Sequence, residues 1–186
     1  MIKLEIVCAG IGGRGVLLAS TILMETAIAA RLHAMASDEY GMSQRGGSVL
    51  SLVKIGEFKS PLVGRENTDI LLAFEESEFY RNLGFLKEGG KAVVNTGRQA
   101  VQDSVSRLCS ERNITVHLVD ADGIALKKRM IQASNMAMLG FFATLGVEPY
   151  TMKKLESAIH DRVPGKVRET NLQIFREGYG KGGGVV

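Results

Sequence analysis

The fold is decided by I-K-L-E-I-V-C-A (residues 2–9), followed by G-I-G-G-R-G (residues 10–15) and V-L-L-A-S-T-I-L-M (residues 16–24). The first stretch is almost continuously apolar, which is typical of a strand buried on both faces of a parallel sheet. The glycines permit a tight turn, and the third stretch has helical composition without Pro or Gly. A strand, a glycine-rich turn and a helix in this order predict the first unit of an α/β domain.

The same alternation continues along the chain. Further strands are predicted at residues 33–37, 48–55, 58–62, 69–74, 92–95 and 114–119, and helices at residues 16–30, from 75, 104–111, 121–133, 135–145, 151–160 and 166–177. Gly56-Glu57 is a plausible tight turn that would pair residues 48–55 and 58–62 as a hairpin. The pattern predicts a three-layer α/β/α sandwich with a mainly parallel, mixed sheet and one inserted hairpin. We expect one domain over residues 1–178 and a flexible glycine-rich tail over 179–186.

The bulk composition narrows the class of protein. With 186 residues, 45% of them apolar and 23% charged, the chain suits one globular domain. No apolar run approaches about 18 residues and the N-terminus lacks a signal peptide, so we expect a cytoplasmic protein without membrane contact. The net charge of +3 arises from residues 151–186, and the only dense basic run is Lys127-Lys128-Arg129. Aromatic residues are sparse, so nucleic acid is not an expected partner.

Side chains that commonly carry chemistry are few and scattered. Cys8 and Cys109 are far apart and form no CxxC motif, so neither a disulfide framework nor a metal site is predicted. His33, His117 and His160 fall on separate predicted elements. The sequence has no GxSxG elbow and no HExxH pair. We therefore expect no metal site and no catalytic residue in this chain.

The turn after the first strand is the first candidate site. Gly10-Ile11-Gly12-Gly13-Arg14-Gly15 contains the pattern G-x-G-x-x-G between a strand and a helix. The helix N-terminus offers unpaired N–H groups to a phosphate, so the four glycines and Arg14 form a possible anion nest. Asp38 and Glu39 lie close to where an NAD-binding domain places its acidic residue. A nucleotide-binding (NAD or FMN) Rossmann-like oxidoreductase domain is therefore one hypothesis, and simple close packing of strand and helix is the other.

A second glycine cluster, Y-G-M-S-Q-R-G-G-S (residues 40–48), lies between two predicted strands. Loops at strand ends often carry binding sites. The N–H groups of Gly46-Gly47 can form an anion nest to which Arg45 adds charge. The alternative is a surface turn with an exposed arginine.

Together with these two clusters, several further segments carry a resemblance to a known family. They are S60-P-L62, D69-I-L-L-A-F-E75, L86-K-E-G-G90, V94-N-T96 and N135-M-A-M-L-G140, with Lys166, Asn171, Phe175 and Gly178. In these residues the chain resembles the gamma-type subunits of the 2-oxoacid:ferredoxin oxidoreductases (the pyruvate/ketoisovalerate oxidoreductase catalytic-domain family), and above all the beta subunits of the indolepyruvate ferredoxin oxidoreductases. The matches run in order along nearly the whole chain. One departure is Arg14, where the family usually has Gln.

The resemblance implies a subunit of a heteromeric complex that oxidatively decarboxylates a 2-oxoacid. Such complexes use coenzyme A and yield an acyl-CoA, carbon dioxide and reduced ferredoxin. Indolepyruvate or another aryl pyruvate is the favoured substrate, and pyruvate, 2-oxoglutarate or a branched-chain 2-oxoacid is the alternative. The chain alone is expected to be inactive and to serve as a scaffold that binds no cofactor. It would meet ferredoxin only through the complex.

The resemblance also implies where the cofactors and the partner lie. Thiamine diphosphate and iron–sulfur clusters are expected on a larger partner subunit. The residues agree, because two isolated cysteines cannot supply four cluster ligands, and Ala121-Asp122-Gly123 departs from the thiamine motif Gly-Asp-Gly. The surface facing the partner is predicted to include Arg45 as its polar anchor. Its other predicted members are Tyr40, Gln44, Gly46 and Gly47.

Overall fold

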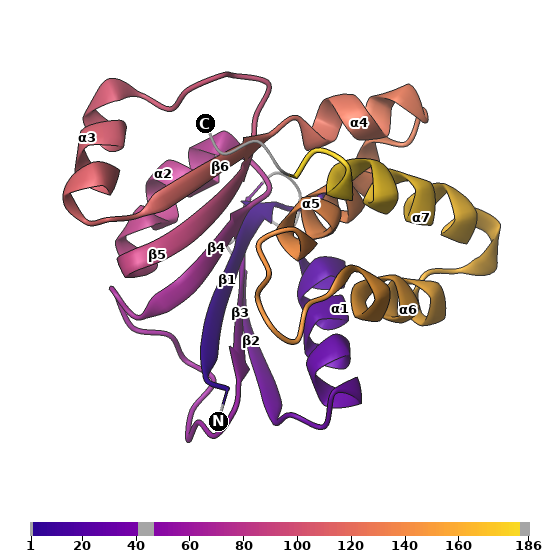
Figure 1. Ribbon diagram of the computed structural model, residues 1–186, viewed down its shortest axis with the longest axis horizontal. Helices are drawn as coiled ribbons and strands as arrows, with labels where there is room; N and C mark the ends of the chain where they lie inside the picture. Colours follow the sequence, from indigo (N-terminus) through magenta and orange to yellow (C-terminus); the bar gives the residue numbers. More distant parts are fainter. Residues whose placement is uncertain (1, 41–46, 183–186) are drawn as a thin grey trace.

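The computed structural model describes residues 2–40 and 47–182. Its strands are β1 (Leu4–Ile11), β2 (Ala34–Tyr40), β3 (Ser48–Ile55), β4 (Thr68–Ala73), β5 (Leu86–Asn95) and β6 (Thr115–Val119). They form one six-stranded sheet in the order β2-β3-β1-β4-β5-β6 (Figure 1). β1, β4, β5 and β6 run parallel, and β3 runs antiparallel to both of its neighbours, β1 and β2.

Helices cover both faces of this sheet (Figure 1). The larger layer contains α1 (Val16–Ala29), α4 (Ala121–Lys127), α5 (Ser134–Ala143), α6 (Met152–Arg162) and α7 (Gly165–Tyr179). The smaller layer contains α2 (Glu76–Asn82) and α3 (Asp103–Glu111). Single turns of 3₁₀ helix lie at Leu83–Phe85 and Ile131–Ala133. The predicted α/β fold with a mixed sheet and one inserted hairpin is thereby confirmed.

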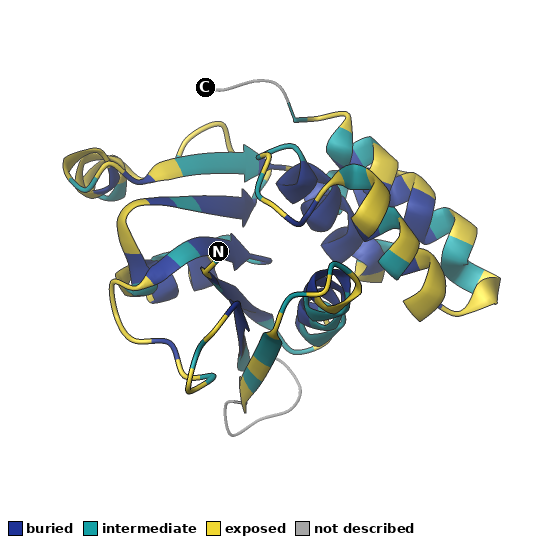
Figure 2. Ribbon diagram, turned by 60° about the horizontal axis from the view of Figure 1, so that its bottom comes forward, coloured by how far each residue is buried: buried dark blue, intermediate teal, exposed yellow. Residues whose placement is uncertain are grey.

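The central strand β1 explains the continuous apolar pattern of the N-terminal sequence. Ile6 and Cys8 pack into the larger core under α1 and α5, whereas Val7 and Ala9 pack into the smaller core under α2. All four residues are fully buried, and the strands at the centre of the sheet are mostly dark blue in Figure 2. Because both faces of β1 are covered, alternation between apolar and polar residues is lost.

Helix α5 is buried on every side within this domain. All ten of its residues are buried, although a surface helix would have a polar face. A Cβ atom on Gly140 would lie 2.0 Å from the carbonyl oxygen of Phe175, and one on Gly178 would lie 2.1 Å from that of Ala137. These two glycines let α5 and α7 meet backbone to backbone.

The partner of β3 in the inserted hairpin differs from the prediction. β3 pairs with β2, placing Ser51 beside Asp38, and residues 58–62 form no strand. Both edges of β3 are already occupied by β1 and β2, so no edge is left for residues 58–62. Phe58 instead lies under the Nζ atom of Lys54, 4.7 Å from its ring centre.

The predicted helix over residues 121–133 is also wrong in its extent. α4 ends at Lys127 because Arg129 adopts a left-handed backbone with φ of 55°, and a separate 3₁₀ turn follows. Lys128 lies 3.0 Å from the carboxylate of Glu177 on α7, and Lys127 and Arg129 are exposed. Among the helices of the described ranges, none has the length and apolarity needed to cross a membrane. Residues 183–186 of the predicted tail lie outside those ranges.

Candidate functional site

The carboxyl ends of β1 and β4 form the topological switch point of the sheet. The two strands are neighbours, but α1 follows β1 onto one face while α2 follows the glutamates after β4 onto the other (Figure 1). In open α/β sheets ligands bind in the crevice at such a point. Here a cavity of about 440 Å³ is lined by the glycine loop from Ile11 to Arg14, by Glu75, and by Ile131 and Gln132. This crevice is the candidate site.

The glycines of the first loop are required by backbone geometry and by close packing. Gly13 and Gly15 have φ values of 97° and 71°, a conformation that other residues rarely adopt. A Cβ atom on Gly15 would lie 2.4 Å from the side-chain nitrogen of Asn135, which donates a hydrogen bond to the Gly15 carbonyl oxygen at 3.1 Å. The loop therefore locks β1 to α5 as well as to α1.

Two of the loop N–H groups are already bound to protein oxygens. The N–H of Arg14 donates to the carbonyl of Ile11 at 3.1 Å, and the N–H of Gly12 donates to the carbonyl of Gly47 at 3.0 Å. The second of these bonds joins the two glycine clusters of the sequence. The anion nest at Gly10, Gly12, Gly13, Arg14 and Gly15 stays a prediction, with fewer free donors than the motif alone suggests.

The Arg14 side chain lies between two carboxylates. Its two terminal nitrogens donate to the carboxylate oxygens of Asp122 at 3.1 and 3.0 Å, and its Nε contacts the carboxylate of Glu75. A bidentate guanidinium–carboxylate pair is geometrically specific as well as strong. Arg14 thereby links the ends of β1 and β4 to α4. The cluster has one positive and two negative charges and is net negative, so Arg14 does not present an unpaired guanidinium to an anion.

Asn95, at the end of β5, completes this cluster. Its side-chain nitrogen donates to the Phe74 carbonyl and to Asp122, both at 3.0 Å. Its side-chain oxygen accepts from the N–H groups of Ala121 and Asp122 at 3.0 and 3.2 Å. One buried amide thus fixes the start of α4 against the ends of β4 and β5.

A second group of hydrogen-bonded side chains, centred on the carboxylate of Glu76, lies at the start of α2. Glu76 accepts hydrogen bonds from the hydroxyls of Tyr80 and Thr96, each at 2.7 Å, and pairs with Arg98 at 3.1 Å. The hydrogen bond from Tyr80, followed by that from Thr96, lowers the pKa of Glu76 because both bonds favour its charged form. Burial, and then the bond to Glu76, raise the pKa of Tyr80.

The second glycine cluster is anchored to α2 through a buried glutamate. Ser48 donates its hydroxyl to Glu78 at 2.6 Å, and Glu78 also accepts from Asn82 at 3.3 Å. Of the predicted interface residues, Tyr40 ends β2 and Gly47 accepts the bond from Gly12. Gln44, Arg45 and Gly46 lie outside the described residues.

The histidines and cysteines remain separated in space. His33 and His160 are exposed, while His117 on β6 packs 5.9 Å from the ring of Phe141. Cys8 and Cys109 are free thiols buried in the two opposite cores. Across residues 2–40 and 47–182, no group of three His, Cys, Asp or Glu side chains is placed to hold a metal ion.

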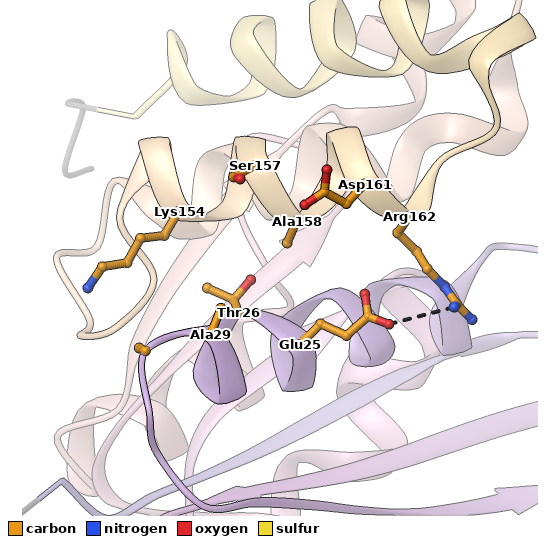
Figure 3. Close-up of a pocket in the computed structure, with 9 residues that line it drawn as sticks. Glu25, Thr26, Ala29, Lys154, Ser157, Ala158, Asp161 and Arg162 are labelled. Atoms are coloured by element: carbon orange, nitrogen blue, oxygen red, sulfur yellow. Dashed lines mark ion pairs between the residues drawn. The ribbon is translucent and has the colours of Figure 1, made fainter.

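A further hollow of about 450 Å³ lies between α1 and α6. Glu25 and Arg162 pair across it at 3.6 Å, and Lys154 and Asp161 add charges of both signs (Figure 3). On the α1 side, the lining comes from the carboxyl-terminal part of that helix. The glycine loop precedes the first residue of α1, so the hollow and the loop lie at opposite ends of the helix. With mixed charges and only small apolar residues such as Ala29 and Ala158, it selects no ligand of one charge.

Sequence reasoning located the glycine loop but missed its partners. Arg14 and Asp122 are 108 residues apart in the sequence, and no local motif links them. A usable signal was present nonetheless, because Asn95 ends β5 and Asp122 lies just beyond β6. Polar residues that directly follow buried parallel strands converge at one edge of the sheet.

Known proteins resemble this chain along nearly its whole length. The family model "Pyruvate ferredoxin/flavodoxin oxidoreductase" matches residues 5–181. The indolepyruvate oxidoreductase subunit IorB of Methanothermobacter thermautotrophicus is 32% identical over 188 residues, covering 95% of this chain and 96% of that protein. The 2-oxoglutarate synthase subunit KorC of Methanothermobacter marburgensis is 30% identical over 176 residues, covering 94% of each.

Solved structures agree with the sequence relatives. The pyruvate oxidoreductase subunit PORC of Thermotoga maritima superposes with a TM-score of 0.77 at 27% identity, covering 97% of both chains. The gamma subunit of the keto/oxoacid ferredoxin oxidoreductase of Geobacter sulfurreducens gives a TM-score of 0.74 at 26% identity, covering 96% of this chain and 97% of that one. The chain therefore belongs to the pyruvate ferredoxin/flavodoxin oxidoreductase family.

Proposed function

We propose that this chain is the non-cluster scaffold subunit of a 2-oxoacid:ferredoxin oxidoreductase, with indolepyruvate or another aryl pyruvate as the substrate of the complex. The observation that carries the proposal is the end-to-end similarity to IorB. The alignment covers 95% of this chain and 96% of that protein. IorB proteins of three further organisms are 26–30% identical over similar lengths. The complex would convert the 2-oxoacid and coenzyme A to an acyl-CoA and carbon dioxide, and reduce ferredoxin.

The partner is proposed to be a larger subunit that carries thiamine diphosphate and the iron–sulfur clusters. The residues that the structure describes do not fit either cofactor. Cys8 and Cys109 are buried on opposite sides of the sheet, so they cannot ligate one cluster together. The carboxylate of Asp122 is already held by Arg14 and Asn95. Ketoisovalerate oxidoreductase VorA supports a partner, because this chain matches only 36% of that protein's length.

A second candidate keeps the role and changes the substrate. KorC, a 2-oxoglutarate synthase subunit, is 30% identical to this chain over 176 residues, which is little below the identity to IorB. A nucleotide-binding oxidoreductase domain is not favoured by these relatives. The two carboxylates around Arg14 would also repel a phosphate at the first loop.

Purification from the native host tests the role. A tagged chain should co-purify with a larger subunit that contains thiamine diphosphate and iron–sulfur clusters, whereas the chain alone should show no activity. Recovery of the chain without any partner from that host would contradict the proposal. Calorimetry of the isolated chain with NAD(H), NADP(H), FMN and coenzyme A serves as the control, because micromolar binding of a nucleotide would instead favour the nucleotide-binding domain.

The assembled complex decides the substrate. With coenzyme A and ferredoxin present, kcat/KM should be at least tenfold higher for indolepyruvate than for pyruvate, 2-oxoglutarate or a branched-chain 2-oxoacid. An order with 2-oxoglutarate first would select the second candidate. Reduced ferredoxin is measured by absorbance and acyl-CoA by chromatography, so the formation of each product is measured independently.

The surface that meets the partner is proposed to include the second glycine cluster, with Arg45 as its anchor and Tyr40, Gln44, Gly46 and Gly47 around it. At the described end of the cluster, Ser48 is bound to Glu78 and Gly47 to Gly12, which anchors that end to the rest of the domain. Arg45→Ala should weaken co-purification of the larger subunit at least tenfold. The matched control Arg65→Ala replaces an exposed arginine elsewhere and should retain the complex.

A further inference from the structure

The outer edge of β6 lies in a hollow that reaches both faces of the sheet. This hollow, of about 550 Å³, is lined by Val116 and Leu118, which pack on the side of α3, and by His117 and Phe141 on the side of α5. Residues 96–101 and the small side chains of Ser106 and Ser110 complete its walls. β6 is the last strand of the sheet, so the hollow runs along an edge that no described strand pairs.

The two edge strands of the sheet differ in charge. β2, at the other edge, carries Asp38 and Glu39, both exposed. Charged side chains on an edge strand are a common protection against pairing with another chain. β6 has the sequence Thr-Val-His-Leu-Val, which contains no Asp, Glu, Lys or Arg. Burial, and then the nearby charge of Lys91 on β5, lower the pKa of His117, which favours its neutral form.

β6 is also complementary to itself. In an antiparallel pair centred on His117, Thr115 would face Val119 of the second copy and Val116 would face its Leu118. No like charges would meet, and β-branched residues would pair across the strands. Arg112 precedes β6 and Asp120 follows it, so the two-fold axis would bring the acidic end of each strand toward the basic end of the other. Arg112 would keep its ion pair with Glu66 at 3.1 Å.

We propose that two copies of this chain associate through their β6 edges, antiparallel about a two-fold axis at His117. The two six-stranded sheets would then form one continuous sheet of twelve strands. Strand addition at an open edge is a common mode of recognition, in which main-chain hydrogen bonds supply the affinity. The interface is isologous, so it closes after two copies and does not grow into a fibre. The proposal does not depend on the proposed function.

Sedimentation of the full chain, from micromolar to hundreds of micromolar, tests the association. Thr115→Lys places a charge on β6 at an exposed position, so the fold should be retained and the dimer dissociation constant should rise at least tenfold. Ala36→Lys, at an exposed position of β2, is the matched control and should leave the dimer unchanged. A wild-type chain that is monomeric throughout this range would overturn the proposal, as would a dimer that Thr115→Lys does not weaken.

Disulfide trapping tests the register. In the proposed pair His117 faces its own symmetry mate, so His117→Cys should give a covalent dimer under mild oxidation. Ala36→Cys on β2 should give none, and the native Cys8 and Cys109 are buried. A dimer that is not trapped at position 117 would contradict this register. If the isolated chain is monomeric and Thr115→Lys instead blocks assembly with a larger subunit, then the edge binds that subunit and the proposal fails.

Discussion

The crevice at β1 and β4 and the outer edge of β6 are opposites in how their polar groups are used. In the crevice, Arg14 is bound by two carboxylates and Asn95 uses both ends of its amide. At the β6 edge, the side chains are uncharged and the strand lacks a second neighbour among the described strands. Of these two regions, the more highly charged one therefore has its charges paired by internal contacts, whereas the other leaves one edge of β6 unpaired among the described strands. Substitutions should separate a stabilising role from a docking role.

The largest effect is expected for Asn95→Ala in the crevice. The change leaves the buried N–H of Ala121 and the carbonyl of Phe74 without their partners, which should lower the free energy of unfolding by about 2–4 kcal/mol. Urea denaturation measures the loss. Asn67→Ala, at an exposed position, is the control and should cost less than about 0.5 kcal/mol. Equal losses in the two variants would show that the Asn95 bonds contribute little.

A smaller loss is expected for Arg14→Gln, which keeps a polar side chain but removes the charge. Glu75 and Asp122 would lose their shared cation, but the three side chains are about one-fifth to one-third exposed, so solvent limits the cost to about 1–2 kcal/mol. A double-mutant cycle with Asp122→Asn should give a coupling energy above about 0.5 kcal/mol. Additive effects would mean that the bidentate pair does not contribute. Self-association should be unchanged.

The pH dependence of stability should report His117 on β6. Burial lowers its pKa in the folded protein below the ordinary value of 6.5, so the unfolded chain binds the proton more readily. Stability is then fully present above pH 6.5 and is lost as the pH falls through 6.5 toward the lower folded value. His117→Gln should flatten this part of the curve of unfolding free energy against pH. Parallel curves for wild type and variant would contradict the assignment.

The smallest effect on stability is expected for Thr115→Lys. Thr115 is exposed and β6 keeps its pairing with β5, so the free energy of unfolding should change by less than about 0.5 kcal/mol. The same variant should nevertheless lose self-association. Arg14→Gln should do the opposite, because it lowers stability and leaves self-association unchanged. A large stability loss for Thr115→Lys would contradict this distinction between the crevice and the β6 edge.

Much of the architecture was predictable because it follows from local patterns. The apolar run of β1 indicated a strand buried on both faces, and the alternation of strands and helices indicated the α/β class. The hairpin partner of β3 was not predictable in this way, because residues 33–37 and 58–62 both suit a strand and only the crowded edges of β3 exclude the second. Helix α4 ends early through the left-handed conformation of Arg129, which its sequence does not signal.

The sequence by itself determined most of the elements, the family and the position of the first glycine loop. Backbone preference and hydrophobic periodicity act over a few residues, so they can be read along the chain. Only the tertiary structure decided what that loop contacts, since its partners Asp122, Asn135 and Gly47 come from distant segments. Likewise, Thr-Val-His-Leu-Val is an ordinary strand in the sequence. It is an open edge only because the order of strands places it last in the sheet.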